Sequence, residues 1–182
     1  MKGGLPVSHL QALSLVEFER VLVLDSDLVV LQNLDHLVGM PAPAFAFSLP
    51  CPPYLRRWEM NSGVMLLEPS AAEHERMLAL LEDEARVRAA VPSGLLSRDP
   101  GDQALWRVFF ESVYELPLAY NLMRWANVSS SLAAAVRIVH DSHSMRTLRR
   151  AGVFDTPEIH VAIECLGQRA AALLNRTGQG CR

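Results

Sequence analysis

The chain has 182 residues, half of them hydrophobic and 20% charged, as is typical of a folded globular protein with its own core. A net charge of −3 argues against binding nucleic acid through bulk electrostatics. The scattered cysteines Cys51, Cys165 and Cys181 fit neither a metal-binding spacing nor a disulfide framework. No apolar run predicts a membrane span, and the N-terminus has no signal-peptide pattern. Location stays open between cytoplasm and Golgi lumen.

The first third of the chain predicts a short helix followed by apolar strands. Residues 9–18 carry apolar side chains at helical spacing, including Val16 and Phe18. The continuous run 21–24 is typical of a parallel strand that is buried on both faces. A further apolar stretch covers 28–31, a turn with a short helix follows it, and residues 45–47 predict another strand.

The remaining elements alternate between strands and helices. A loop at 61–63 should enter a strand at 64–67, and Ser70 with Glu73 forms a capping box for a helix that runs to about residue 90. Another helix should begin near Asp102, a later strand with the apolar run 136–139 should end at His140, and 156–175 should form a final helix. This alternation predicts a single α/β domain over residues 1–182.

Two aspartates, Asp25 and Asp27, follow the first buried strand. Side chains two residues apart on an extended chain point the same way, so both carboxylates can converge on one cation. Without a cation their repulsion would push one of them toward protonation. An acidic turn exposed to solvent is the simpler interpretation, and the buried strand before it favours a site.

A histidine stands in the same position after a later strand. His140 follows an apolar run, so its imidazole is also expected at the edge of the sheet, and His143 is the alternative ligand. Two carboxylates with one imidazole suit a divalent ion, and the imidazole favours Mn²⁺ over Mg²⁺. On its own, a histidine in this place is more often structural.

Two short motifs are ambiguous when each is taken alone. Asn61, Ser62 and Gly63 fit an ordinary turn, although Gly permits close approach to a ligand and Asn suits a sugar hydroxyl. Asp102 and Gln103 fit a simple helix start, where an acid is common.

The order of these pieces resembles that of the glycogenin-like retaining glycosyltransferases of family eight. The resemblance covers Leu5 to His140 and rests on five ordered motifs: "ERVLVLDSDLVVLQNLDHL", "NSGVMLLEPS", "GDQALW", "ELPLAYN" and "VRIVH". It implies the GT-A fold, a Rossmann-like α/β sandwich that binds nucleotide sugars. It also implies transfer of a sugar from a UDP-sugar to an acceptor with retention at the anomeric carbon.

The resemblance also implies the roles of the site residues. Asp25, Asp27 and His140 would hold Mn²⁺, with Mg²⁺ as the alternative, against the diphosphate of the donor. Asn61, Ser62 and Gly63 would border the donor sugar. Asp102 and Gln103 would lie beside the anomeric carbon, with Asp102 as a nucleophile or as a stabiliser of positive charge. The donor sugar, the oligomeric state and the acceptor (a glycan, a protein or a small molecule) stay open.

The chain departs from the family pattern at two places. Only about twenty residues precede Asp25, where the family has further strand–helix units that contact uridine. After His140 the family's glycine and Lys-Pro-Trp are absent, and Arg146, Arg149 and Arg150 stand in that region. We therefore expect an N-terminally truncated transferase domain that is weakly active or inactive by itself.

Two other functions compete with this interpretation. A haloacid-dehalogenase-like phosphatase also begins with a strand followed by DxD, but it requires a downstream lysine, and Lys2 is the only lysine in the chain. A degenerate transferase fold that binds without catalysing is the second alternative.

Overall fold

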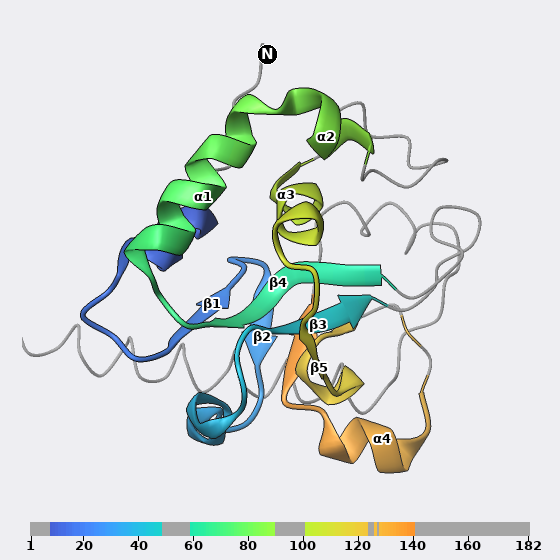
Figure 1. Ribbon diagram of the computed structural model, residues 1–182. Helices are drawn as coiled ribbons and strands as arrows, with labels where there is room; N and C mark the ends of the chain where they lie inside the picture. Colours follow the sequence, from blue (N-terminus) through green and yellow to red (C-terminus); the bar gives the residue numbers. More distant parts are fainter. Residues whose placement is uncertain (1–7, 49–58, 90–100, 124–125, 127, 141–182) are drawn as a thin grey trace, which may run out of the picture.

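The computed structural model describes residues 8–48, 59–89, 101–123, 126 and 128–140, which form a mixed α/β fold with two sheets (Figure 1). The strands are Val21–Leu24 (β1), Leu28–Val30 (β2), Ala44–Ser48 (β3), Glu59–Leu67 (β4), Tyr114–Leu116 (β5), Leu122–Met123 (β6) and Ile138–His140 (β7). The α-helices are Ala71–Glu82 (α1), Glu84–Ala89 (α2), Gly101–Phe109 (α3) and Ser130–Ala135 (α4). The 3-10 helices are His9–Ser14 (η1), Asp35–Gly39 (η2) and Leu118–Tyr120 (η3).

The larger sheet has the strand order β1-β4-β3-β5. β4 pairs antiparallel with both β1 and β3, and only β5 runs parallel to its neighbour β3. The register between β3 and β4 shifts between Phe45 and Ala46. Such an irregularity bends a strand locally, and here it lies close to Asn61, which pairs with Ala46.

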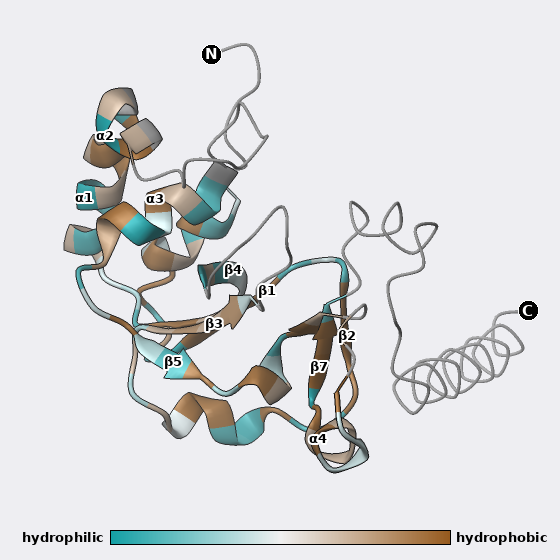
Figure 2. Ribbon diagram, turned by 90° about the vertical axis from the view of Figure 1, so that its right-hand side faces the viewer, coloured by the Kyte–Doolittle hydropathy of each residue, from teal (hydrophilic) through white to brown (hydrophobic). Residues whose placement is uncertain are grey.

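The smaller sheet has the order β2-β7-β6, with β2 antiparallel and β6 parallel to β7. Leu28 pairs with His140 at one end of this sheet. The three residues between β1 and β2 therefore carry the chain from the end of the larger sheet to the end of the smaller one. Figure 2 shows the two sheets as separate groups of strands, with the smaller one close to α4.

The interior is divided between the two faces of β4. Met65 and Leu67 pack toward a cluster built with α1, α3 and η1, in which Trp106 is fully buried. Val64 and Leu66 pack on the opposite face with residues that include Ile138 of β7. The apolar run in β4 is thus explained by its central position between two layers.

Helix α3 is fixed to β4 by a buried ion pair. The guanidinium of Arg107 lies 2.7 Å from the carboxylate of Glu59 and also donates to the backbone oxygen of Met60 at 2.9 Å. Both side chains are mostly shielded from solvent. The pair therefore joins the last turn of α3 to the start of β4.

Several predictions about the elements are wrong. β1 pairs antiparallel, lies at a sheet edge and is only half buried, so the continuous apolar run did not mark a parallel strand. Asn61 to Gly63 lie inside β4 and not in a loop. Val16 and Phe18 were predicted to belong to the first helix, but η1 ends at Ser14 and both side chains are exposed.

The helix predicted to run from Ser70 to about residue 90 is divided into α1 and α2. Ser70 accepts a hydrogen bond from the backbone of Glu73, as predicted. The reciprocal half of the capping box is missing, because the Ser70 backbone donates to Leu13 and Glu73 pairs with Arg76. The late strand ends at His140, as predicted, but β7 begins at Ile138 and not at Val136, which directly follows α4.

The predicted helix at 156–175, His143 and the arginines at 146, 149 and 150 lie outside the described residues. Within the described part, no helix is long and apolar enough to cross a membrane. The α/β class agrees with the prediction and is compatible with a Rossmann-like sandwich. The GT-A assignment and the truncation stay predictions.

Candidate metal centre and its neighbouring carboxylate

Asp25 extends the pairing of β1 with β4 by one residue. Its backbone N–H donates to the backbone oxygen of Gly63 at 2.9 Å. The aspartate therefore lies beside the glycine of the Asn-Ser-Gly motif, and the two predicted motifs meet at the end of β1. Its side chain is 27% exposed, so the carboxylate is still open to a ligand.

Asp25, Asp27 and His140 form one group. A ligand atom from each lies within 4.8 Å of the other two, and His140 Nε2 is 3.2 Å from a carboxylate oxygen of Asp27. The predicted convergence of the DxD pair and the late histidine is therefore confirmed. It arises where the two sheets meet, because β1 ends in one sheet and β7 in the other.

A chain of hydrogen bonds determines which ring nitrogen of His140 carries the proton. The Gly63 backbone N–H must donate, so the atom of Asn61 that it reaches at 2.9 Å is the side-chain oxygen. Asn121 then donates its amide to that oxygen at 3.0 Å and turns its own oxygen to His140 Nδ1 at 2.9 Å.

That oxygen can only accept, so Nδ1 of His140 carries the proton. In the neutral imidazole the other nitrogen, Nε2, then holds the lone pair, and it faces Asp27. The backbone amide of Gly63 thus fixes the tautomer of His140 through Asn61 and Asn121. In this tautomer the nitrogen that can bind a metal lies on the side of the carboxylates.

Gly63 allows His140 to lie this close to β4. A Cβ atom at Gly63 would come within 2.8 Å of His140 Cε1 and of the Asn61 side-chain oxygen. Real Cβ atoms essentially never approach so closely, and neither neighbour is free to move. The strand therefore requires glycine at this position for packing.

Asp102 lies in the first turn of α3 and faces the same group. One of its oxygens accepts from the Ser62 hydroxyl at 3.3 Å, and the other lies 2.9 Å from His9 Nδ1. Gln103, its neighbour, accepts from the Asn61 side-chain amide at 3.1 Å. All three residues of the Asn-Ser-Gly motif are thus engaged with the site.

His9, at the start of η1, was not predicted as a site residue. Its ring lies between two carboxylates, with Nδ1 near Asp102 and Nε2 3.3 Å from Asp25. Sequence reasoning used η1 only for its apolar positions, and a single histidine in front of a strand gives no signal of its own. Asn121 was also missed as a site residue, although it ends the motif "ELPLAYN", which the resemblance included.

The charges in the site shift two pKa values. The pKa of His9 is raised, chiefly by its hydrogen bond with Asp102, against the opposing effect of burial; the charges of both carboxylates add to the rise. The pKa of Asp25 is raised chiefly by burial; the nearby charges of His9 and His140 oppose this shift, and Asp102 and Asp27 add to it. Asp25 therefore lies in a place that disfavours its charge, and a bound cation would offset that cost.

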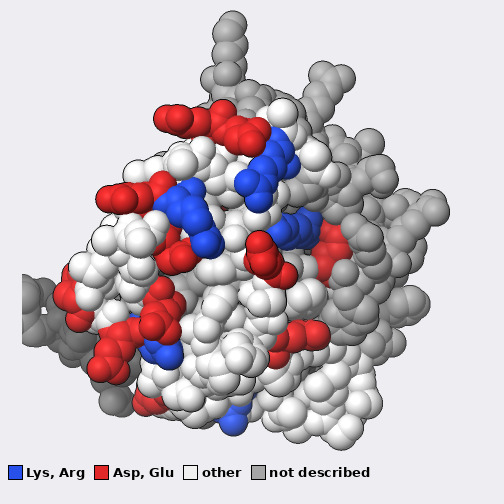
Figure 3. All heavy atoms as spheres, in the orientation of Figure 1, with Lys and Arg blue, Asp and Glu red and all other residues white. Residues whose placement is uncertain are grey.

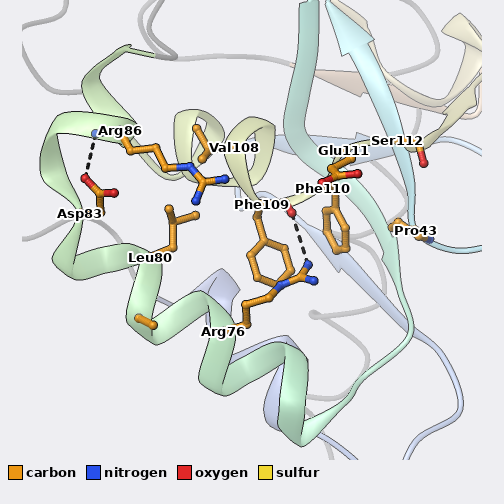
Figure 4. Close-up of a pocket in the computed structure, with 11 residues that line it drawn as sticks. Pro43, Arg76, Leu80, Asp83, Arg86, Val108, Phe109, Phe110, Glu111 and Ser112 are labelled. Atoms are coloured by element: carbon orange, nitrogen blue, oxygen red, sulfur yellow. Dashed lines mark hydrogen bonds between the residues drawn. The ribbon is translucent and has the colours of Figure 1, made fainter.

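A separate cavity of about 550 Å³ lies between α1, α2 and the end of α3 (Figure 4). Arg76 is already occupied there: it pairs with Glu73 and lies 4.3 Å over the Phe109 ring. Arg86 shares the lining with Asp83 and Glu111, so the charges are balanced. Acidic and basic side chains are likewise interspersed on the face of the molecule that Figure 3 shows. This cavity shares no residue with the Asp25 group and does not select a ligand.

Comparisons with known proteins point to glycosyltransferases. The chain is 25% identical over 170 residues to galactinol synthase 4 of Arabidopsis thaliana, which covers 73% of this chain and 47% of that protein. It is also 25% identical over 117 residues to UDP-glucuronate:xylan alpha-glucuronosyltransferase 2 of Arabidopsis thaliana, covering 63% and 17% of the two chains. An uncharacterized protein of Acanthamoeba polyphaga mimivirus is 32% identical over 81 residues, 37% of this chain and 29% of that one.

No family model matches the chain. The chain spans less than half the length of these relatives. The galactinol synthases and the glucuronosyltransferase support a resemblance to glycosyltransferases of family eight in general and do not single out glycogenin. The chain is thus distantly similar to glycosyltransferases.

Proposed function

We propose that this chain belongs to a divalent-metal-dependent glycosyltransferase that moves a sugar from a UDP-sugar to an acceptor with retention at the anomeric carbon. The observation that carries the proposal is the group formed by Asp25, Asp27 and His140, in which the hydrogen-bond network leaves Nε2 of the histidine turned toward the carboxylates. The similarity to galactinol synthases and to a UDP-glucuronate-dependent enzyme supports it.

The residues present fit a divalent cation. Atoms that share one ion through bonds of about 2.2 Å lie at most about 4.4 Å apart, so a group within 4.8 Å needs only a small contraction. Two carboxylates with one imidazole favour Mn²⁺, and Mg²⁺ is the alternative. When bound, the ion would neutralise charge that develops on the departing UDP.

The remaining roles fall to the neighbouring side chains. Asn61 and Gly63 would border the donor sugar, as the family resemblance implies. Asp102 would stabilise positive charge at the anomeric carbon: Ser62 and His9 already orient both of its oxygens, and each oxygen keeps a further lone pair. Gln103 would lie beside the anomeric carbon next to Asp102, and its contact with Asn61 orients its side chain.

The test compares the wild-type chain with Asp27→Asn and Asp35→Asn. Asp35 is an exposed aspartate outside the group, so its variant has the same chemical change and serves as the control. Calorimetry with Mn²⁺ and UDP should show that each strengthens binding of the other, because the diphosphate completes the coordination. Asp27→Asn should abolish that coupling, and Asp35→Asn should leave it intact.

Turnover is measured as release of UDP from a panel of UDP-sugars with and without Mn²⁺. Equal Mn²⁺ affinity in all three proteins would overturn the metal centre. Coupled binding of Mn²⁺ and UDP without any turnover would favour the non-catalytic binding module. Hydrolysis of a phosphate monoester that Asp25→Asn abolishes would favour the phosphatase.

A further inference from the structure

His9 connects parts of the site that come from three separate elements. It begins η1, Asp25 follows β1, and Asp102 lies in the first turn of α3. The two ring nitrogens face two different carboxylates, at 2.9 Å to Asp102 and 3.3 Å to Asp25. The imidazole of His9 therefore bridges the two carboxylates.

The position of His9 is fixed by the packing of η1. Leu10 and Leu13 are buried in the core next to α1 and α3, and the backbone oxygen of Leu13 accepts from the Ser70 backbone at 3.0 Å. Only 24% of the His9 side chain is exposed. The imidazole is therefore held by a packed helix and does not reach the carboxylates from a free side chain in solvent.

Asp102 requires such a contact to keep its orientation. A carboxylate in the first turn of a helix is already stabilised by that helix end and can satisfy itself with solvent. Here it is only 15% exposed, and Ser62 restrains just one of its oxygens, at 3.3 Å. His9 holds the other oxygen at the shorter distance of 2.9 Å, and the opposite side of its ring contacts Asp25.

We propose that His9 is a positioning residue that holds the Asp102 carboxylate beside the Asp25, Asp27 and His140 group. The inference rests on the proposed function for its kinetic consequence, because Asp102 would act at the anomeric carbon. An imidazole suits the role because its two nitrogens point in different directions, so one rigid ring serves both carboxylates.

The kinetic test uses three substitutions. His9→Gln removes the bridge, because one amide donor reaches only one carboxylate. His9→Arg restores N–H donors on two sides together with a positive charge. Gln11→Ala, an exposed change on the same helix, is the matched control.

We expect His9→Gln to lower kcat for UDP release by at least about ten-fold, the effect of losing a hydrogen bond to a charged group. KM for the UDP-sugar and the affinity for Mn²⁺ should change by less than about threefold. His9→Arg should recover part of kcat, and Gln11→Ala should match the wild type. Equal kcat in His9→Gln and Gln11→Ala, or a loss confined to KM, would overturn the proposal.

A spectroscopic arm separates this inference from the proposed function, because it needs no turnover. Long-range ¹H–¹⁵N spectra of histidine-labelled protein should show a proton on His9 Nδ1, and that signal should shift in Asp102→Asn but not in Gln11→Ala. A bare Nδ1, or a signal that ignores Asp102→Asn, would overturn the positioning role. A wild-type chain that releases no UDP but shows the expected shift would support the positioning role and would refute only turnover by this chain alone.

Discussion

The candidate site has two halves that are built in different ways. On one side, His140 is only 7% exposed and is oriented by neutral amides, through Asn121 and Asn61 to the backbone of Gly63. On the other side, His9 and Asp102 are more accessible and are held by contacts between ionisable groups. We call these the amide half and the charged half.

The difference concerns how each half keeps its geometry. In the amide half, a backbone N–H that can only donate sets the donor and acceptor roles of all the following groups. The arrangement therefore does not depend on a change of protonation. It is tightly packed and tolerates no change of shape. The charged half tolerates changes of shape better, and its contacts depend on the charges of His9, Asp25 and Asp102. Substitutions that alter shape or charge alone should therefore separate the two halves.

The largest effect is expected for Gly63→Ala. The added methyl group would overlap His140 and the Asn61 side chain, both of which are held by hydrogen bonds. We expect the free energy of unfolding to fall by about 3 kcal/mol, the upper end for overpacking. Mn²⁺ binding should be lost with it, because His140 must move away from Asp27.

Gly39→Ala is the matched control for this substitution, since a Cβ atom at Gly39 meets nothing within 4 Å. Chemical denaturation and Mn²⁺ calorimetry measure both variants. Equal stability and equal Mn²⁺ affinity in Gly63→Ala and Gly39→Ala would show that the close approach of His140 to β4 is not a requirement of the site.

A smaller effect is expected for Asn121→Leu, which keeps the volume and removes the amide. The buried Nδ1–H of His140 then lacks its acceptor, which costs about 2 kcal/mol of stability. Mn²⁺ affinity should fall by about 10–100-fold, as for other residues that orient a metal ligand.

Asn121→Asp sharpens this test, because it keeps an acceptor for His140 Nδ1 and loses the donor to Asn61. If the tautomer of His140 is what matters, Asn121→Asp should retain more Mn²⁺ affinity than Asn121→Leu. Equal losses in the two variants would mean that the hydrogen bond to Asn61, which both variants lack, is what matters, and that the acceptor for His140 Nδ1 is not.

Sequence reasoning predicted the types of most elements and misjudged their pairing. The continuous apolar run before Asp25 is typical of a parallel strand buried on both faces, whereas β1 is a partly buried antiparallel edge strand. In the structure the strand buried on both faces is β4, which achieves this through its central place in an antiparallel arrangement. Periodicity reports burial, and it cannot report the direction of the neighbouring strand.

The site was predictable where its residues lie within recognisable motifs. Asp25, Asp27 and His140 were predicted to converge, and the structure brings them together. His9 and Asn121 were not identified as site residues, because their roles depend on contacts between residues 93 and 19 positions apart. Such contacts follow from tertiary packing and leave no local pattern.

The smallest effect is expected in the charged half, for Asp25→Asn in the metal-free protein. Burial raises the pKa of Asp25 above its ordinary value of 3.8, so the folded state binds this proton more tightly than the unfolded state does. Ionised Asp25 therefore destabilises the metal-free protein at neutral pH. Asp25→Asn should be slightly more stable there, although it loses a metal ligand.

The pH dependence gives the sign of this effect. The advantage of Asp25→Asn should be fully present above the folded-state pKa of Asp25, should shrink as the pH falls through that pKa, and should vanish below 3.8. Urea denaturation at several pH values, with and without Mn²⁺, measures it. Added Mn²⁺ should reverse the order of the two proteins, because it stabilises only the one that keeps the carboxylate. A variant that is less stable than the wild type at pH 7 without metal would show that the contact with His9 outweighs burial.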